Sequence, residues 1–197
     1  MCERNDLYRN VIAVTNRKLC GRPFLQQIGR VCENRPAALI LREKDLSEGA
    51  YRTLAEDVRT ICDSAGVKLI LHKYRHTALA LGIHAVHLPL GDLTAMNGED
   101  GAYRGFFEEI GCSVHSVQEA RRAQQLGADY LIAGHIYPTD CKKDLPPRGL
   151  NFLREVCGAV SIPVYAIGGI HPDADQIRQV MNAGAAGACI MSAAMRL

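Results

Sequence analysis

The chain has 197 residues, of which 48% are hydrophobic and 22% charged, a composition typical of a globular protein with one sizeable core. Its 23 Lys and Arg residues nearly balance its 21 Asp and Glu residues, and the net charge of +2 argues against nucleic acid or an anionic membrane surface as a partner. Every apolar run falls short of the roughly 20 residues of a membrane-spanning helix. The amino terminus, MCERNDLYRN, is charged where a secretory signal is apolar, so we expect one cytoplasmic domain over residues 1–197.

The cysteines invite a disulfide or metal interpretation, but they form no CxxC pair and no ligand-like spacing with the seven histidines. Several lie inside apolar patterns, where cysteine packs as a small hydrophobe. We therefore expect free thiols. The eight positions are Cys2, Cys20, Cys32, Cys62, Cys112, Cys141, Cys157 and Cys189.

Short apolar runs recur along the chain and indicate strands. Most are continuous rather than alternating, as expected for strands covered on both faces. Helix-like stretches separate them, which favours a parallel sheet. The eight predicted strands are Val11–Val14, Ala37–Leu41, Lys68–Leu71, Ala85–Leu88, Cys112–Val114, Tyr130–Ala133, Val164–Ile167 and Ala188–Met191.

The stretches between the strands are amphipathic and carry helix start signals. Ser47 precedes one helix, Ser116 and Glu119 form a capping box, and Pro172 stands in the first turn of another helix. Thr94–Ile110 is polar and contains glycine, so its helical pattern is weak. The other predicted segments are Pro23–Glu33, Ser47–Ala65, a short turn near Thr77–Leu81, Val117–Leu126, Leu150–Cys157 and Pro172–Asn182.

Eight strand–helix units in this length average about 25 residues each, the compact limit of a (β/α)₈ barrel. Only Ser192–Leu197 follows the last strand, which predicts a shortened eighth helix. An open doubly wound sheet is the alternative, but the segment after the first strand has no GxGxxG turn. We therefore predict a single α/β domain with the TIM-barrel fold, and place its chemistry at the carboxyl ends of the strands.

Two cations follow the second predicted strand. Arg42 and Lys44 are two residues apart and face the same side if the strand continues. Lys73, after the third strand, can approach them from the neighbouring strand end. These three residues predict a site for a phosphate or a carboxylate, and a solvated pair of loop charges is the alternative.

Two glycines end the seventh strand, in AIGGIHP at Ala166–Pro172. Gly168 and Gly169 permit close approach of backbone amides to an anion, and the next strand ends in Ser192 and Ala193. In barrels, the loops after the last two strands commonly form a phosphate site. The pattern predicts such a site here.

His135 directly follows the apolar run YLIAG, so we expect its ring over the barrel mouth. Thr139 and Lys142 lie in the same loop. A neutral imidazole in this place can transfer a proton near pH 7. A histidine that is simply hydrogen-bonded in a tight turn is the alternative.

Five blocks, in order, carry a family resemblance: LREKDL at Leu41–Leu46, ALALGIHAVHL at Ala78–Leu88, SVHSVQEA at Ser113–Ala120, GADYLIAGHIYPTDCKK at Gly127–Lys143 and IPVYAIGGI at Ile162–Ile170. From about Val11 to Ala194 the chain resembles the thiamine phosphate synthase superfamily. Within it, the sequence is most similar to the TenI-like branch of thiazole tautomerases.

Synthases of this superfamily join a thiazole phosphate to a hydroxymethylpyrimidine pyrophosphate, and the resemblance implies Mg²⁺ held by two aspartates. The first belongs to an Asn-Asp pair that here reads His72-Lys73, and a protonated lysine repels Mg²⁺ instead of binding it. Asp92 matches the second, but its block has lost the usual Gly-Gln, and Ile40 replaces a usual glutamine. On these positions we expect the synthase site to be dismantled.

The tautomerase branch carries a histidine after strand six, which Gly134-His135 matches. The resemblance implies that His135 moves a proton on a non-aromatic thiazole carboxylate phosphate and so produces the aromatic isomer, without any metal. We therefore expect a metal-independent thiazole tautomerase of thiamine biosynthesis that uses no cofactor. A Mg²⁺-dependent thiamine phosphate synthase and a non-catalytic thiamine-phosphate-binding regulator are the alternatives.

The resemblance also implies which residues bind the phosphorylated thiazole. Its phosphate would be held by Gly168, Gly169, Ser192 and Ala193, with Lys142 or Thr139 closing over the ligand. Arg42, Lys44 and Lys73 would face the carboxylate or remain from a pyrophosphate site. Because the missing eighth helix would leave apolar surface, we also expect a homo-oligomer, in the first instance a dimer.

Overall fold

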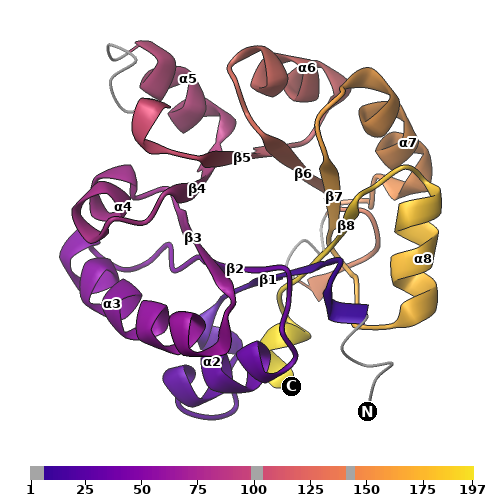
Figure 1. Ribbon diagram of the computed structural model, residues 1–197. Coiled ribbons are helices and arrows are strands. Elements are labelled where there is room, and N and C mark those ends of the chain that lie inside the picture. The colour runs from indigo at the N-terminus through magenta and orange to yellow at the C-terminus, as the bar shows by residue number, and fades with distance from the viewer. Residues whose placement is uncertain (1–6, 99–103, 141–144) are drawn as a thin grey trace.

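The computed structural model describes residues 7–98, 104–140 and 145–197, which form a closed barrel (Figure 1). Its eight strands are parallel and follow one another around the ring in chain order, and β1 closes the ring by pairing with β8. The helices lie outside the ring (Figure 1). The predicted (β/α)₈ TIM-barrel fold is confirmed.

The strands are short, apolar runs whose backbone groups pair with both neighbours. They are β1 (Val11–Val14), β2 (Ala38–Leu41), β3 (Lys68–His72), β4 (Ala85–Pro89), β5 (Glu109–Val114), β6 (Tyr130–Gly134), β7 (Val164–Ile167) and β8 (Gly187–Ile190). The predicted limits agree within one residue except for β5. That strand begins three residues earlier than predicted because Glu109 and Gly111 interrupt its apolar pattern.

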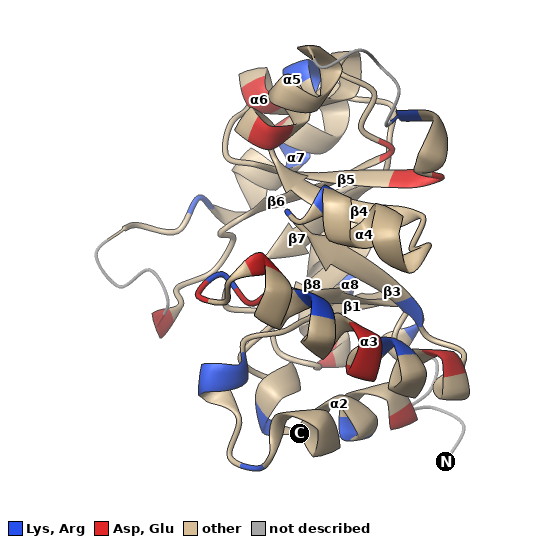
Figure 2. Cartoon of the chain, turned by 90° about the vertical axis from the view of Figure 1, so that its left-hand side faces the viewer, with Lys and Arg blue, Asp and Glu red and all other residues tan. Residues whose placement is uncertain are grey.

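The segments between strands are mostly helical. They are η1 (Arg17–Leu19), α2 (Phe24–Glu33), α3 (Glu48–Ala65), α4 (Arg75–Leu81), α5 (Leu90–Gly98), η2 (Arg104–Phe106), α6 (Val117–Gln125), α7 (Gly149–Ala159), α8 (Ala174–Asn182) and η4 (Ala194–Arg196), where η denotes a 3₁₀ turn. Acidic and basic residues both occur on the outer helices (Figure 2), in keeping with the small net charge. Among the described residues, no helix is long and apolar enough to cross a bilayer.

Helix starts follow the capping signals with one exception. The Ser47 and Ser116 hydroxyls accept hydrogen bonds from the amides of Ala50 and Glu119. For α8, however, the cap is Asp173, whose side chain accepts from the Gln176 amide, so Pro172 precedes the helix and the prediction that placed it in the first turn is wrong.

The helix that the weak pattern indicated within Thr94–Ile110 lies earlier in the chain. The structure has α5 beginning at Leu90, with Leu93 and Met96 buried, and Ile110 belongs to β5. Since α5 follows β4 with no intervening loop, the end of that strand hid the start of the helix.

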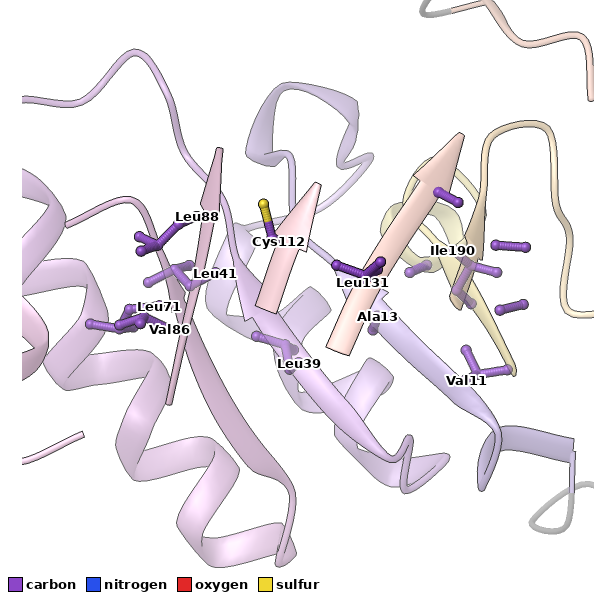
Figure 3. Packing of buried hydrophobic residues seen from close by; sticks show 14 of the residues in the cluster. Val11, Ala13, Leu39, Leu41, Leu71, Val86, Leu88, Cys112, Leu131 and Ile190 are labelled. Carbon is purple, nitrogen blue, oxygen red and sulfur yellow. The ribbon is translucent and has the colours of Figure 1, made fainter. Parts of the chain in front are cut away.

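Alternate strand residues face opposite sides of the barrel wall, as the pleat requires. Val11 and Ala13 point outward into the layer between strands and helices, which Figure 3 shows together with residues of β2 to β4. Ile12 and Val14 point inward. The buried inward set is Ile12, Val14, Ala38, Ile40, Ile70, Ala85, Tyr130, Ile132 and Cys189.

The segment after β8 forms the short turn η4 where a full barrel would have an eighth helix, as predicted. Ala194 and Met195 are buried, and the Gln27 side chain of α2 donates a 2.7 Å hydrogen bond to the Ala194 carbonyl. The turn therefore lies beside α2 (Figure 1). Because the apolar residues Ala194 and Met195 are buried within the chain, they expose no apolar surface here, and the homo-oligomer stays a prediction.

The described cysteines are free thiols, as predicted. Cys32 of α2 and Cys62 of α3 lie buried with their Sγ atoms 4.0 Å apart. Cys2 and Cys141 lie outside the described residues.

Candidate functional site

A cavity of about 930 Å³ opens at the carboxyl ends of the strands, and all eight strands contribute to its wall. We call it the mouth cavity. Its apolar floor and walls include Val14, Ile40, Ile132, Ile167 and Met191. Because this is the end of a TIM barrel that carries active sites, the mouth cavity is the candidate site.

The alternation of the strands decides which side chains reach the mouth cavity. Ile40 faces the barrel interior, and Arg42 and Lys44, which continue its parity beyond β2, both line the cavity. Leu41 and Glu43 have the opposite parity and are buried away from it. The predicted pairing of Arg42 and Lys44 on one face is therefore present.

Lys73 departs from the prediction. It is exposed, stands just past β3 with φ of 72°, and is not among the residues that line the mouth cavity. The reason is again parity, because His72 takes the inward position and the next residue faces away. Lys73 still lies near enough to contribute to the electrostatic environment of His72.

Glu43 organises the loop that carries the two cations. Its carboxylate, only 3% exposed, accepts hydrogen bonds from the Thr15 hydroxyl at 2.7 Å and from the Arg17 backbone amide at 3.0 and 3.1 Å. The Arg17 guanidinium adds an ion pair at 3.2 Å and also binds Asp45, whose pKa it lowers. The loop after β2 is thus tied to the loop after β1.

Histidines dominate the polar lining of the mouth cavity. His72 and His87 face inward from β3 and β4, with ring centroids 6.1 Å apart. Burial lowers the pKa of each to about 3, and for His72 the neighbouring His87, Arg42, Lys44 and Lys73 lower it further. Both rings are therefore neutral at physiological pH. The five lining histidines are His72, His87, His115, His135 and His171.

A buried polar chain fixes His87. Its Nδ1 lies 3.2 Å from the Tyr130 hydroxyl and its Nε2 lies 2.8 Å from the Ser113 hydroxyl, so both ring nitrogens have partners within the protein. Gly111 makes room for this contact, since a Cβ there would lie 2.1 Å from Cζ of Tyr130. Ser113 lines the mouth cavity, and His87 holds its hydroxyl in place.

His135 lies in the wall of the mouth cavity, as predicted. It is buried, and its Nε2 donates a 3.3 Å hydrogen bond to the Leu145 carbonyl. Gly134 precedes it through a cis peptide bond, and the Gly134 carbonyl accepts a 2.9 Å hydrogen bond from Nδ1 of His115. The two histidines thus belong to one wall of the site, formed by the ends of β5 and β6.

Gly168 and Gly169 also line the mouth cavity, with φ of 104° and 68°. A Cβ on Gly168 would lie 2.3 Å from the His135 Cβ, and one on Gly169 would lie 2.3 Å from the Pro138 carbonyl oxygen. Both positions therefore require glycine, because a side chain would clash with the loop that follows β6 and because their φ values are positive. Whether they also bind a phosphate stays a prediction.

The remaining predicted residues divide in two. Thr139, Ser192 and Ala193 line the mouth cavity, whereas Lys142 lies outside the described residues. Arg196 of η4 also lines the cavity and was missed, because nothing in the sequence indicated that the segment after β8 folds back over the mouth.

His72, His87 and Ser113 were missed as well, although a signal for them existed. His72 and His87 stand two residues after the inward-facing Ile70 and Ala85. Ser113 stands two residues after Gly111, where a Cβ would meet Tyr130 and His87. Continuing the period-two pattern to the strand ends therefore places all three in the cavity.

The described residues do not fit the Mg²⁺ ion that the resemblance implies for synthases. Mg²⁺ takes oxygen ligands, usually one or two carboxylates with phosphates and water. Of the two aligned positions, one is the ammonium of Lys73. The other, Asp92, keeps a buried Oδ2 without a hydrogen-bond partner but does not line the mouth cavity. No group of three or more His, Cys, Asp or Glu in the described ranges is arranged to hold a metal.

Comparison with known proteins gives a consistent result. The family described as thiamine monophosphate synthase matches residues 11–194. The chain is 36% identical over 187 residues to a thiamine-phosphate synthase of Desulfitobacterium hafniense (strain Y51), covering 91% of this chain and 86% of that one. It is 32% identical over 184 residues to a thiamine-phosphate synthase of Syntrophomonas wolfei, covering 92% and 86%.

Among solved structures, the thiamine phosphate pyrophosphorylase of Pyrococcus furiosus superposes with a TM-score of 0.79 at 30% identity, covering 98% of this chain and 89% of that one. Together these matches overturn the expectation of a metal-independent thiazole tautomerase, because the relatives are named as synthases. The acid/base role expected of His135 belonged to that isomerisation and is withdrawn with it. The chain belongs to the thiamine monophosphate synthase family.

Proposed function

We propose that this chain is a transferase that joins a thiazole phosphate to a hydroxymethylpyrimidine pyrophosphate, forming thiamine phosphate and releasing pyrophosphate. Relatives named thiamine-phosphate synthase, at 32–36% identity over about nine-tenths of the chain, support this reaction class.

The observation that carries the proposal is that two separate parts of one cavity carry groups suited to binding an anion. Arg42 and Lys44 supply cationic side chains after β2, whereas Gly168 and Gly169 supply a backbone cradle after β7. Strands β1 and β8 lie between them around the ring. Two regions of different chemistry suit a reaction between two phosphorylated substrates.

The size of the mouth cavity agrees with two substrates. Its volume of about 930 Å³ lies near the top of the range of about 300–1,000 Å³ typical of small-molecule sites. Apolar side chains, among them Ile132, Ile167 and Met191, form the wall against which two flat rings can pack.

The reaction requires positioning and charge stabilisation. The thiazole nitrogen donates its electron pair to the pyrimidine methylene carbon, forming a C–N bond, while the C–O bond to pyrophosphate breaks and its electrons leave with that group. The thiazole becomes a cationic thiazolium and no proton has to leave it. Arg42 and Lys44 would stabilise the charge on the departing pyrophosphate, and the glycine cradle would hold the thiazole phosphate.

The neutral state of His72 and His87 suits this chemistry. Uncharged rings in the floor of the mouth cavity bring no additional positive charge against the forming thiazolium. Since His87 also fixes the Ser113 hydroxyl, the floor presents a positioned polar group to a substrate ring.

The proposal is tested by incubating the protein with both substrates and detecting thiamine phosphate by mass spectrometry, with each substrate omitted in turn. We expect product only with both. Arg42→Met is expected to lower the rate by about 10²-fold or more, and Arg52→Met, which removes an exposed arginine of α3 paired with Glu56, is the matched control expected to leave it unchanged. Absence of product both with Mg²⁺ and with EDTA would contradict the proposal.

A further inference from the structure

We infer that the mouth cavity binds a diphosphate directly, with its charge neutralised by Arg42, Lys44 and Arg196 and not by a divalent cation. The inference rests on the proposed function for the choice of diphosphate as the ligand. It departs from the Mg²⁺ that the family resemblance implies, and it follows from the residues that this chain places in the cavity.

The first argument is the charge of the cavity lining. Three side chains with fixed positive charge line it, namely Arg42, Lys44 and Arg196, and among the described residues Asp140 is the one acidic side chain that does so. A divalent cation in such a lining meets repulsion at short range, whereas an anion with several negative charges meets attraction.

The second argument is the lack of suitable ligands at the strand ends. At the end of β3, the inward side chain is the imidazole of His72, and Lys73 follows. At β4, both nitrogens of His87 are engaged with Tyr130 and Ser113. Since Mg²⁺ prefers carboxylate and phosphate oxygens, neither strand end offers it a suitable oxygen ligand.

The third argument is the local electrostatic environment. Burial lowers the pKa of His72 most, and the neighbouring His87, Arg42, Lys44 and Lys73 lower it further. The neighbouring cations that oppose protonation of His72 also repel Mg²⁺, and they attract phosphate oxygens.

The fourth argument is that the backbone of the loop carrying Arg42 and Lys44 is held in place before any ligand binds. The Arg42 backbone amide donates a 2.9 Å hydrogen bond to the Thr15 hydroxyl, and that hydroxyl donates to the buried carboxylate of Glu43 between the two cations. Arginine binds phosphate oxygens in pairs through its planar guanidinium. The backbone that carries these cations is therefore already ordered and loses little freedom when the diphosphate binds.

The test is calorimetric titration of inorganic pyrophosphate into the full chain, first in EDTA and then with millimolar Mg²⁺. We expect binding in EDTA, and equal or weaker binding with Mg²⁺ because the ion competes with the protein for the phosphate oxygens. Binding seen only with Mg²⁺, or tightened about tenfold or more by it, would overturn the inference.

Variants identify the residues responsible. Arg42→Met and Lys44→Met are each expected to weaken pyrophosphate binding in EDTA by about tenfold or more, because each removes a charge-assisted contact. Arg52→Met is the matched control, since it removes the same charge from the outer face of α3. Unchanged affinity in both cavity variants would also overturn the inference.

The condensation assay separates this inference from the proposed function. Product formed in EDTA supports both. Product formed only with Mg²⁺ leaves the transferase standing and overturns the metal-free site. Pyrophosphate binding in EDTA without product under any condition supports the site and overturns the transferase.

Discussion

The hydroxyl of Thr15 donates a 2.7 Å hydrogen bond to Oε1 of Glu43 and so joins the segments that follow β1 and β2. Both side chains are buried. The Arg17 backbone amide completes the contact by donating to the same carboxylate. A buried carboxylate in this setting is stable because its hydrogen bonds replace those it would make with water.

Replacing this carboxylate should destabilise the protein. Glu43→Ala leaves the Thr15 hydroxyl and the Arg17 amide without their acceptor, and we expect the free energy of unfolding to fall by about 2–4 kcal/mol. Glu43→Gln keeps one acceptor oxygen and should cost about half as much. Urea denaturation measures both, and a loss below about 0.5 kcal/mol in the alanine variant would show that the contact contributes little.

Two buried histidines should make stability depend on pH. The pKa values of His72 and His87 are lowered to about 3 in the folded protein, against about 6.5 in an unfolded chain. Between these values the unfolded state binds more protons, so stability is complete above about pH 6.5 and falls as the pH falls toward 3. Each histidine contributes a slope of at most about 1.4 kcal/mol per pH unit.

The measurement is urea denaturation at pH 7 and pH 5 for the parent chain and for His72→Gln and His87→Gln. Each variant should show a smaller drop between the two pH values than the parent. His76→Gln, at an exposed position of α4, is the control that should keep the parental slope. An equal drop in all four proteins would show that neither buried ring is responsible.

Gly111 should tolerate no side chain. In Gly111→Ala the new Cβ would lie 2.1 Å from Cζ of Tyr130 and 2.5 Å from Nδ1 of His87, which forces the buried polar chain apart. We expect a loss of about 3 kcal/mol in the free energy of unfolding. Tyr130→Phe, which removes one hydrogen bond without adding volume, should cost about 1 kcal/mol. If thermal unfolding ranks the two variants in the opposite order, packing around Gly111 is looser than the structure shows.

Two alanine substitutions should have opposite signs. Gly169 has φ of 68° and a Cβ there would meet the Pro138 carbonyl oxygen at 2.3 Å, so Gly169→Ala should destabilise by about 1–3 kcal/mol. Gly29 lies within α2 with open space around its Cα, so Gly29→Ala should stabilise by about 0.5–1 kcal/mol. Melting temperatures by circular dichroism test the pair, and a shift of the same sign in both would contradict the account of Gly169.

The predicted dimer can be measured directly. The turn η4 buries Ala194 and Met195. The large hydrophobic side chains exposed in the described part of the chain lie apart in the sequence, with Leu25 on α2, Leu145 in the loop before α7 and Met181 on α8. Light scattering after size exclusion, at micromolar concentration, should give twice the mass of 21.5 kDa if the prediction holds. The mass of one chain would refute it.

Much of the fold could be predicted because local patterns agree with the tertiary structure. Runs such as Val11–Val14 and Ala38–Leu41 are buried on both faces, which leaves a continuous apolar signal that sets the strand limits. Where a helix follows a strand without a loop, as at Leu90, the two patterns merge and the boundary is lost. The start of β5 was lost for a related reason, since Gly111 serves the packing of Tyr130 and not the strand pattern.

The site was predicted in part. Arg42 and Lys44 were placed correctly because parity along one strand is a local property. Lys73 was misplaced because its location was inferred from proximity to a strand end, without regard to parity. The contribution of Arg196 depends on how the segment after β8 packs on α2, a contact between residues 167 positions apart that no local pattern records. The choice of reaction rested on His135 and on the apparent loss of the synthase residues at His72-Lys73, and full-length similarity to named synthases outweighed both.

The pairing of β1 with β8 has a consequence for how the protein is made. The ribosome makes β1 before β8, so the ring cannot close until β8 has been made, and any sheet formed before then has two unpaired edge strands. Only when the final strand and the turn after it emerge can the ring shut and Ser192, Ala193 and Arg196 take their places. The protein can therefore bind its ligand only after β8 has formed, and incomplete chains need protection from aggregation.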